Sequence, residues 1–198
     1  VLRANGRYRV VMLRTDDSRV PLEDRLKIAR EAAPDLFISL HADAHHDPKV
    51  RGGSVYTLSD EGSKRSTREV LSQGDYQIFD LNIKDEPADL RPILVDLAQS
   101  HTKNRSGQLA NLLITHLSGV PPLINNPPPP ADLKVLLSPD IAAVLLELAF
   151  ISNAQDEANL MSPAWRKKTM AAVANAIDAY FDDRAPTQHA SRGREGTR

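Results

Sequence analysis

Two short apolar runs, each followed by an ionisable side chain, constrain the fold of this chain more than any other feature. Residues 36–40 read Leu-Phe-Ile-Ser-Leu and lead into His41, and residues 141–146 are six apolar positions that lead into Glu147. Nearly continuous apolar runs of this length are typical of strands covered on both faces, as in α/β proteins. The pattern predicts an α/β fold in which His41 and Glu147 stand at the carboxyl ends of two buried strands.

Helical and strand-like patterns alternate along the rest of the chain. Helices are predicted over 21–33, over most of 60–118 and from Ser162-Pro163 to Phe181, because apolar residues recur there at helical spacing. Further strands are predicted at 8–13, 53–58 and 133–137. The strand–helix–strand order between residues 8 and 40 predicts a right-handed βαβ crossover with a parallel pair. We therefore expect one α/β domain, with a mostly parallel twisted sheet flanked by helices.

Length and composition suggest one globular unit followed by a tail. The 198 residues suffice for a single sizeable core, and 41% of them are hydrophobic. We expect the domain to occupy residues 1–182 and residues 183–198, rich in Arg, Gly, Ser and Glu, to be disordered. The first six residues resemble neither a signal peptide nor a domain start. We accordingly expect a fragment of a domain whose upstream part is absent.

Charge and hydropathy exclude several classes of partner. The formal net charge of −1 gives no general attraction to nucleic acid or to an anionic membrane. No apolar stretch approaches the ~20 residues that cross a bilayer, so no membrane span is predicted. The chain contains no cysteine, which excludes disulfides and thiolate ligation of a metal.

The pair His41 and Glu147 is the main candidate for chemistry. Ligands of open α/β sheets gather beyond the carboxyl ends of the strands, where both side chains are expected. A neutral imidazole binds zinc well, and a carboxylate beside a reactive water acts as a general base. The alternative is structural: His41 as a hydrogen-bonded core histidine and Glu147 paired with a buried Arg or Lys.

Three longer motifs in order resemble one enzyme family. They are Arg-x-x-Asp with Pro-Leu and Arg over residues 14–25, Ser-x-His-Ala-Asp at 39–43, and Glu-x-Ala-Phe-Ile-Ser-Asn at 147–153. Together they resemble the zinc-dependent N-acetylmuramoyl-L-alanine amidases of the amidase-3 type, from about Val10 to Phe181. The resemblance implies hydrolysis of the amide between N-acetylmuramic acid and L-alanine in peptidoglycan, with His41 as a zinc ligand and Glu147 as the catalytic glutamate.

The same resemblance implies features that these residues do not carry. The family's other two zinc ligands are a histidine in a Gly-His-Gly-Gly turn after the first strand and a glutamate on the next helix, and neither motif has a match in the sequence. The resemblance therefore implies that both ligands and the first strand lie before Val1 and that the first strand is missing here. Zn²⁺ would then belong to the complete domain, and a periplasmic location is implied. The alternative is an inactive fragment or pseudo-amidase that binds peptidoglycan or a partner without turnover. We interpret His45 and His46 as surface histidines rather than substitute ligands.

A few other residues are weaker candidates. Asp43 either orients the His41 ligand or caps the following turn, and Arg14 is interpreted as forming a buried ion pair with Asp17. Residues 104–106 are predicted to cap a helix.

The segment 61–92 matches the region that, in amidases of cell separation, carries a helix covering the zinc until an activator protein displaces it. Asp75 is the candidate for the blocking carboxylate there. Removing residues 70–90 from the complete domain is expected to raise its basal activity.

Overall fold

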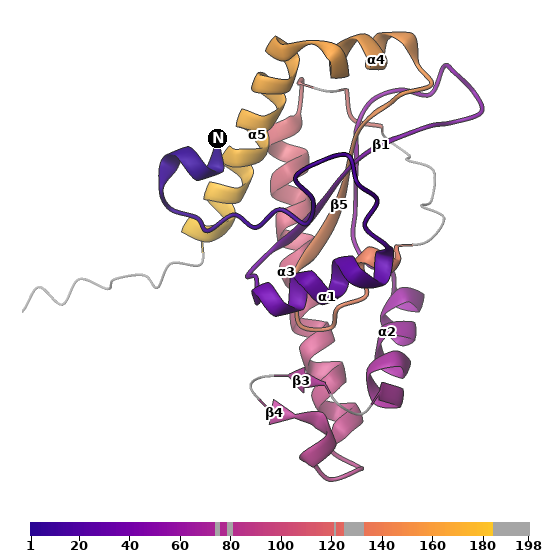
Figure 1. Ribbon diagram of the computed structural model, residues 1–198, viewed down its shortest axis with the longest axis vertical. Helices are drawn as coiled ribbons and strands as arrows, with labels where there is room; N and C mark the ends of the chain where they lie inside the picture. The colour runs from indigo at the N-terminus through magenta and orange to yellow at the C-terminus, as the bar shows by residue number, and fades with distance from the viewer. Residues whose placement is uncertain (74–75, 79–80, 121, 125–132, 184–198) are drawn as a thin grey trace, which may run out of the picture.

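A mixed three-stranded sheet with helices on both faces forms the centre of the fold. The computed structural model describes residues 1–73, 76–78, 81–120, 122–124 and 133–183 (Figure 1). The sheet consists of β1 (Phe37–Asp43), β2 (Ser54–Tyr56) and β5 (Ala143–Phe150), in the order β1-β5-β2. β1 runs parallel to β5, and β2 runs antiparallel to it. The predicted α/β class is confirmed, with a parallel pair at its centre and an antiparallel third strand.

The described residues also form five α-helices: α1 (Leu22–Ala32), α2 (Asp60–Gln73), α3 (Arg91–Leu117), α4 (Ala154–Met161) and α5 (Pro163–Asp182). The last two begin at side-chain caps. Asn153 Oδ1 accepts hydrogen bonds from the Gln155 and Asp156 N–H groups, and Ser162 Oγ accepts one from Trp165. Pro163 then occupies the first helical turn, where a missing N–H costs nothing. The predicted start of the final helix is confirmed.

Alternate residues of β5 pack into two apolar clusters on opposite faces of the sheet. Val144 and Leu146 join the main core with α3 and α5, whereas Ala143 and Leu145 pack against the 3₁₀ helix η3 (Lys134–Leu136). α1 contacts η3 on that second side, opposite α3 (Figure 1). Because strand side chains alternate, Glu147 shares the face of Leu145 and lies on the α1 side.

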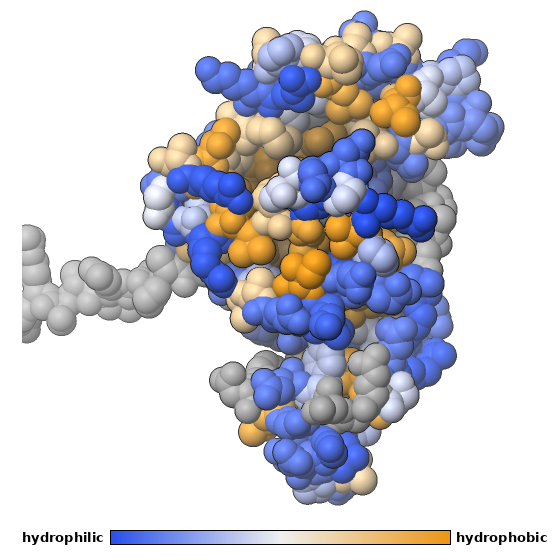
Figure 2. All heavy atoms as spheres, viewed as in Figure 1, coloured by the Kyte–Doolittle hydropathy of each residue, from blue (hydrophilic) through white to orange (hydrophobic). Residues whose placement is uncertain are grey.

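Two predicted strands are wrong. Residues 8–13 form no strand and residues 133–137 form η3, so the βαβ crossover predicted before residue 40 is wrong as well. An apolar run becomes a strand only where a neighbouring strand completes its hydrogen bonds, and among the described residues β1 pairs with β5 instead. Val11 and Met12 are consequently exposed, and apolar side chains gather on the viewed face of the molecule (Figure 2).

Described residues of the segment 61–92 form most of a small lobe at the end of the molecule (Figure 1). It contains the short strands β3 (Gln77–Ile78) and β4 (Leu81–Asn82), the 3₁₀ helix η2 (Ile83–Asp85), and the ends of α2 and α3. Its core is separate from the main one and is formed by Val70, Tyr76, Ile78, Ile83, Val95 and Ala98. The Tyr76 hydroxyl donates to Asp140 at 2.8 Å, which ties the lobe to the turn before β5.

A two-glycine turn brings β2 close to β5. Gly52 has a φ of 101°, and a Cβ placed on it would lie 2.1 Å from the Pro122 carbonyl oxygen. A Cβ on Gly53 would lie 3.0 Å from the Glu147 carbonyl oxygen. Only glycine combines this conformation with such close approach, so β2 packs tightly beside β5 at Glu147.

Candidate active site

His41 and Glu147 lie side by side at the carboxyl ends of the parallel pair. They are register partners in β1 and β5, and His41 Nδ1 is 3.7 Å from Glu147 Oε1. The Glu147 side chain is only 7% exposed, whereas that of His41 is 37% exposed. The structure thus brings together the two residues that the sequence singled out, with the carboxylate buried and the imidazole at the surface.

The environment of Glu147 favours its protonated form. Burial, followed by the negative charge of Asp43, raises the pKa of Glu147 to about 7, while a backbone hydrogen bond from Asp43 acts in the opposite direction. No described Arg or Lys forms an ion pair with Glu147, and its Oε2 atom is buried without a hydrogen bond to any described residue. The structural alternative of a basic partner for Glu147 is therefore wrong within the described chain.

The surroundings of His41 favour its neutral imidazole form. Burial, followed by the positive charge of Arg25 on α1, lowers the pKa of His41, and Asp43 opposes this shift. The other ring nitrogen, Nε2, lies 2.9 Å from Ser39 Oγ. A neutral imidazole hydrogen-bonded through one nitrogen has the other available for a ligand or a proton.

The weaker candidates are placed differently. Asp43 ends β1, and its Oδ1 accepts from the Ala44 N–H at 2.7 Å, which matches the turn-capping alternative. Arg14 and Asp17 are both exposed, and Arg14 donates to the Ser18 carbonyl oxygen, so the expected burial of this pair is wrong. Residues 104–106 lie inside α3 rather than at its start, so the predicted cap is wrong. Ser106 Oγ instead accepts a hydrogen bond from the Ala143 N–H of β5. Asp75 lies outside the described residues.

The loop after β1 is anchored to the segment that follows β5. The His45 N–H donates to Ser152 Oγ at 2.9 Å, and its ring packs edge-on against Phe150. Asn153 Nδ2 donates to the Pro48 carbonyl oxygen at 2.7 Å. His45 is thus half-buried and structural, whereas His46 is exposed as expected.

The described residues do not complete a zinc site. A catalytic zinc normally has three protein ligands and a water molecule. Across the placed parts of the chain, no group of three or more His, Asp or Glu side chains is arranged to hold a metal ion. His41 and its neighbouring carboxylate account for at most part of such a site.

Three residues that sequence reasoning missed shape the site. Ser54 and Tyr56 of β2 face the same side as Glu147, and the buried Asp156 accepts hydrogen bonds from Gly52 and Phe150. Burial, with smaller contributions from the charges of Glu147 and Asp43, raises the pKa of Tyr56, and the Ser54 hydroxyl opposes the shift. The Gly-Gly pair before Ser54 was the available signal, since adjacent glycines at a strand start indicate close backbone approach.

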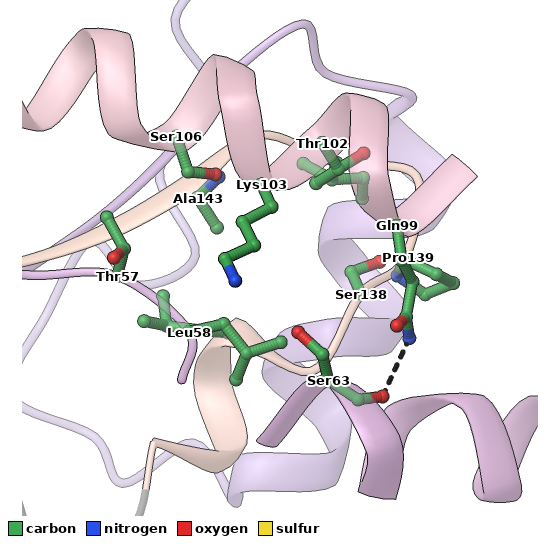
Figure 3. Close-up of a pocket in the computed structure, with 12 residues that line it drawn as sticks. Thr57, Leu58, Ser63, Gln99, Thr102, Lys103, Ser106, Ser138, Pro139 and Ala143 are labelled. Atoms are coloured by element: carbon green, nitrogen blue, oxygen red, sulfur yellow. Dashed lines mark hydrogen bonds between the residues drawn. The ribbon is translucent and has the colours of Figure 1, made fainter. Parts of the chain in front are cut away.

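A small cavity elsewhere in the molecule is not part of this site. It has a volume of about 20 Å³, which is room for a water molecule. Its lining includes Ser63, Gln99 and Lys103, and Gln99 donates to the Ser63 carbonyl oxygen (Figure 3). None of the predicted site residues lines it.

In the same described ranges, no helix has the length and apolarity needed to cross a membrane.

Sequence comparison identifies relatives along nearly the whole chain. The profile of the N-acetylmuramoyl-L-alanine amidase family matches residues 1–179. The amidase AmiA of Salmonella typhimurium is 35% identical over 173 residues, which are 86% of this chain and 60% of AmiA. AmiA of Escherichia coli K12 is 33% identical over the same shares. The chain spans about 60% of the length of these curated relatives.

Solved structures share the fold. The CwlD amidase of Clostridioides difficile, solved in complex with the GerS lipoprotein, gives a TM-score of 0.63 at 18% identity and covers 92% of this chain and 80% of its own. The amidase Ami1 of Mycobacterium smegmatis gives 0.62 at 22% identity and covers 92% and 70%. At these identities the comparison establishes the fold alone.

Proposed function

Since the chain belongs to the N-acetylmuramoyl-L-alanine amidase family, we propose that it forms part of an enzyme that hydrolyses the amide between N-acetylmuramic acid and L-alanine in peptidoglycan. The observation that carries this proposal is the contact between His41 and the buried Glu147 at the carboxyl ends of β1 and β5. Residues 1–182 would belong to the catalytic domain of a periplasmic protein that acts in cell separation.

The chemistry assigned to Glu147 is that of a general acid and base. Its carboxylate takes a proton from a water molecule whose oxygen bonds to the lactyl carbonyl carbon. As the carbon–nitrogen bond breaks, the same carboxyl group returns a proton to the amino group of L-alanine. Burial keeps the carboxyl group away from bulk water, and the imidazole of His41 lies 3.7 Å from its Oε1 atom.

Zinc, in the complete domain, would supply a Lewis acid for the scissile carbonyl. We assign His41 to it as one ligand, and the further ligands that such a site needs are not among the placed residues. Arg14 and Asp43 are proposed only as supports of the surrounding loops. An activator protein, and a blocking role for Asp75, belong to the same proposal, and the complex of CwlD with a lipoprotein is a precedent for a partner of this fold.

Among the residues that the structure describes, the ligand set is incomplete, and this observation favours a second candidate, a pseudo-amidase that binds peptidoglycan or a partner without turnover. One experiment separates the two. The full-length protein is assayed for dye release from labelled peptidoglycan and for new N-terminal L-alanine, and its zinc content is measured by mass spectrometry. Co-sedimentation with peptidoglycan without any product would favour the pseudo-amidase.

Glu147→Gln is the first prediction for the active enzyme. Loss of a general base reduces turnover by about 10²–10⁴-fold, and the isosteric amide preserves the shape of the buried side chain. The matched control is Glu157→Gln, the same change at an exposed position on α4, and we expect wild-type turnover from it. Equal activity of the two variants would show that Glu147 is not the base.

A further inference from the structure

Ser54 is the third member of a row of side chains that crosses the sheet. Glu147 pairs in register with His41 of β1 on one side and with Ser54 of β2 on the other. Register partners in a sheet point to the same face, with Cβ atoms about 4.5–5.5 Å apart. The carboxylate of Glu147 therefore lies between an imidazole on one neighbouring strand and a hydroxyl on the other.

Both members of the Ser54–Glu147 pair carry a buried oxygen without a hydrogen bond of normal geometry to any described residue. Ser54 is 3% exposed, and its hydroxyl interacts with the Tyr56 hydroxyl on the same face of β2. Oε2 of Glu147 is buried as well, whereas Oε1 faces His41. A buried polar atom left unpaired destabilises the fold, and a hydrogen bond from a hydroxyl to a carboxylate oxygen removes this cost for both atoms.

The backbone is built for close approach at this point. Gly53 precedes Ser54, and its missing Cβ would lie 3.0 Å from the Glu147 carbonyl oxygen. Asp156 holds the turn by accepting from the Gly52 N–H at 2.6 Å. It also accepts from the Phe150 N–H, so one carboxylate fixes the start of β2 and the end of β5. Ser54 and Glu147 are thus held at fixed spacing from both sides.

We propose that Ser54 is a positioning residue for Glu147, whose hydroxyl donates a hydrogen bond to Oε2 and orients the carboxylate toward the attacking water. The donation requires only rotation of the serine about χ1, since the backbone positions are already set. The assignment rests on the proposed function of Glu147, and it names the residue that orients the base. Tyr56, two residues along the same face of β2, is the competing donor.

A stability measurement tests the contact without any assay of activity. In urea unfolding of the full-length protein, Ser54→Ala is expected to lower the folding equilibrium constant about tenfold, as for loss of a hydrogen bond to a charged group. In a Glu147→Ala background the same substitution should have little further effect. Ser66→Ala is the matched control, because Ser66 on α2 is also buried without a hydrogen bond and should show no loss.

The outcomes separate the possible donors. A Ser54→Ala protein as stable as wild type, or more stable, would overturn the contact, because removal of an unpaired buried hydroxyl is neutral or favourable. The same cycle is measured for Tyr56→Phe and Glu147→Ala. A coupling energy between Tyr56 and Glu147, with none between Ser54 and Glu147, would assign the role to Tyr56 and overturn the proposal as well.

Kinetics test the functional part. In the active enzyme, Ser54→Ala is expected to lower kcat about tenfold with KM unchanged, and Ser54→Thr to restore most of the loss by returning a hydroxyl. If Glu147→Gln abolishes turnover while Ser54→Ala has normal kcat, the positioning role fails and the proposed function stands. If Glu147→Gln is fully active, Glu147 is not the base of the proposed reaction and Ser54 has no base to position, and the stability coupling still reports whether the contact exists.

Discussion

Asp156 is the most deeply buried charged side chain in the described part of the chain, at 1% exposure. Its Oδ2 accepts hydrogen bonds from the N–H groups of Gly52 and Phe150, and Arg51 Nε lies 3.6 Å from Oδ1. Two strands of the candidate site therefore depend on a single carboxylate oxygen. Asp156 therefore supports the site through the backbone of the segments that begin β2 and end β5.

Substitution of Asp156 should separate the role of the oxygen from that of the charge. Asp156→Ala leaves two buried N–H groups unpaired, and we expect a loss of about 3 kcal/mol in the free energy of unfolding. Asp156→Asn keeps an acceptor at the position of Oδ2 and should cost about 1 kcal/mol. Urea unfolding monitored by the fluorescence of Trp165 measures both. Equal losses for the two variants would contradict the role assigned to the shared oxygen.

At the same residue scale, the sequence was sufficient for some site positions and insufficient for others. His41 and Glu147 could be predicted because an ionisable group at the end of an apolar run requires an explanation. Ser54 could not, since a serine within a strand is common and its burial depends on the Gly52–Gly53 turn. Arg14 was misjudged, because a matching motif carries no information about whether a loop is buried.

Among the elements, the start of the last helix could be predicted because a cap is a local feature: Ser162 accepts a hydrogen bond from an N–H group of the helix that begins at Pro163. Asn153 caps α4 in the same way, but no helix was predicted there, and the cap predicted at 104–106 is wrong because these residues lie inside α3. The strands predicted at 8–13 and 133–137 are wrong because a strand needs a partner from a distant part of the chain. The apolar side chains near 133–137 are buried just as well by the 3₁₀ helix η3. β5 was predictable because it is apolar on both faces and lies at the centre of the sheet.

The two caps should differ in strength. Asn153 accepts from two N–H groups and also donates to the Pro48 carbonyl oxygen, whereas Ser162 accepts from one N–H at 3.3 Å. We expect Asn153→Ala to lower the free energy of unfolding by about 2 kcal/mol and Ser162→Ala by about 0.5–1 kcal/mol. Thermal or urea unfolding of the two variants side by side gives the ranking. A larger loss of stability for Ser162→Ala than for Asn153→Ala would contradict this ranking, and the hydrogen bond from Asn153 to the Pro48 carbonyl oxygen would then not stabilise the fold.

On the scale of the whole molecule, the N-terminal segment is fastened to the last helix. The Tyr8 hydroxyl donates to Asp178 at 2.6 Å, and Arg7 pairs with Asp178 and Asp182. The Tyr8 ring also packs against Phe181, with ring centroids 5.3 Å apart. These contacts join the two ends of the described chain, although residues 8–13 add no strand to the sheet.

This junction should be sensitive to alkaline pH. Burial, followed by the hydrogen bond to Asp178, raises the pKa of Tyr8 to about 12 from its ordinary value of 10.0. Between these values the unfolded chain loses the tyrosine proton while the folded protein keeps it. The contribution of Tyr8 to stability is therefore complete below pH 10 and declines as the pH rises toward 12.

Tyr8→Phe isolates this contribution, because it keeps the ring on Phe181 and removes the ionisable hydroxyl. We expect wild type to be more stable than the variant by about 1 kcal/mol at pH 8, the size of a partly solvated hydrogen bond. The difference should narrow between pH 10 and pH 11.5 in urea unfolding curves, because Tyr8 ionises in unfolded wild type over that range, which favours unfolding, and the phenylalanine of the variant cannot ionise. A difference that stays constant over that range would place the Tyr8 hydroxyl outside the contact with Asp178. A narrowing gap would instead show that a single phenol, 170 residues from its acceptor, couples the N-terminal segment to α5.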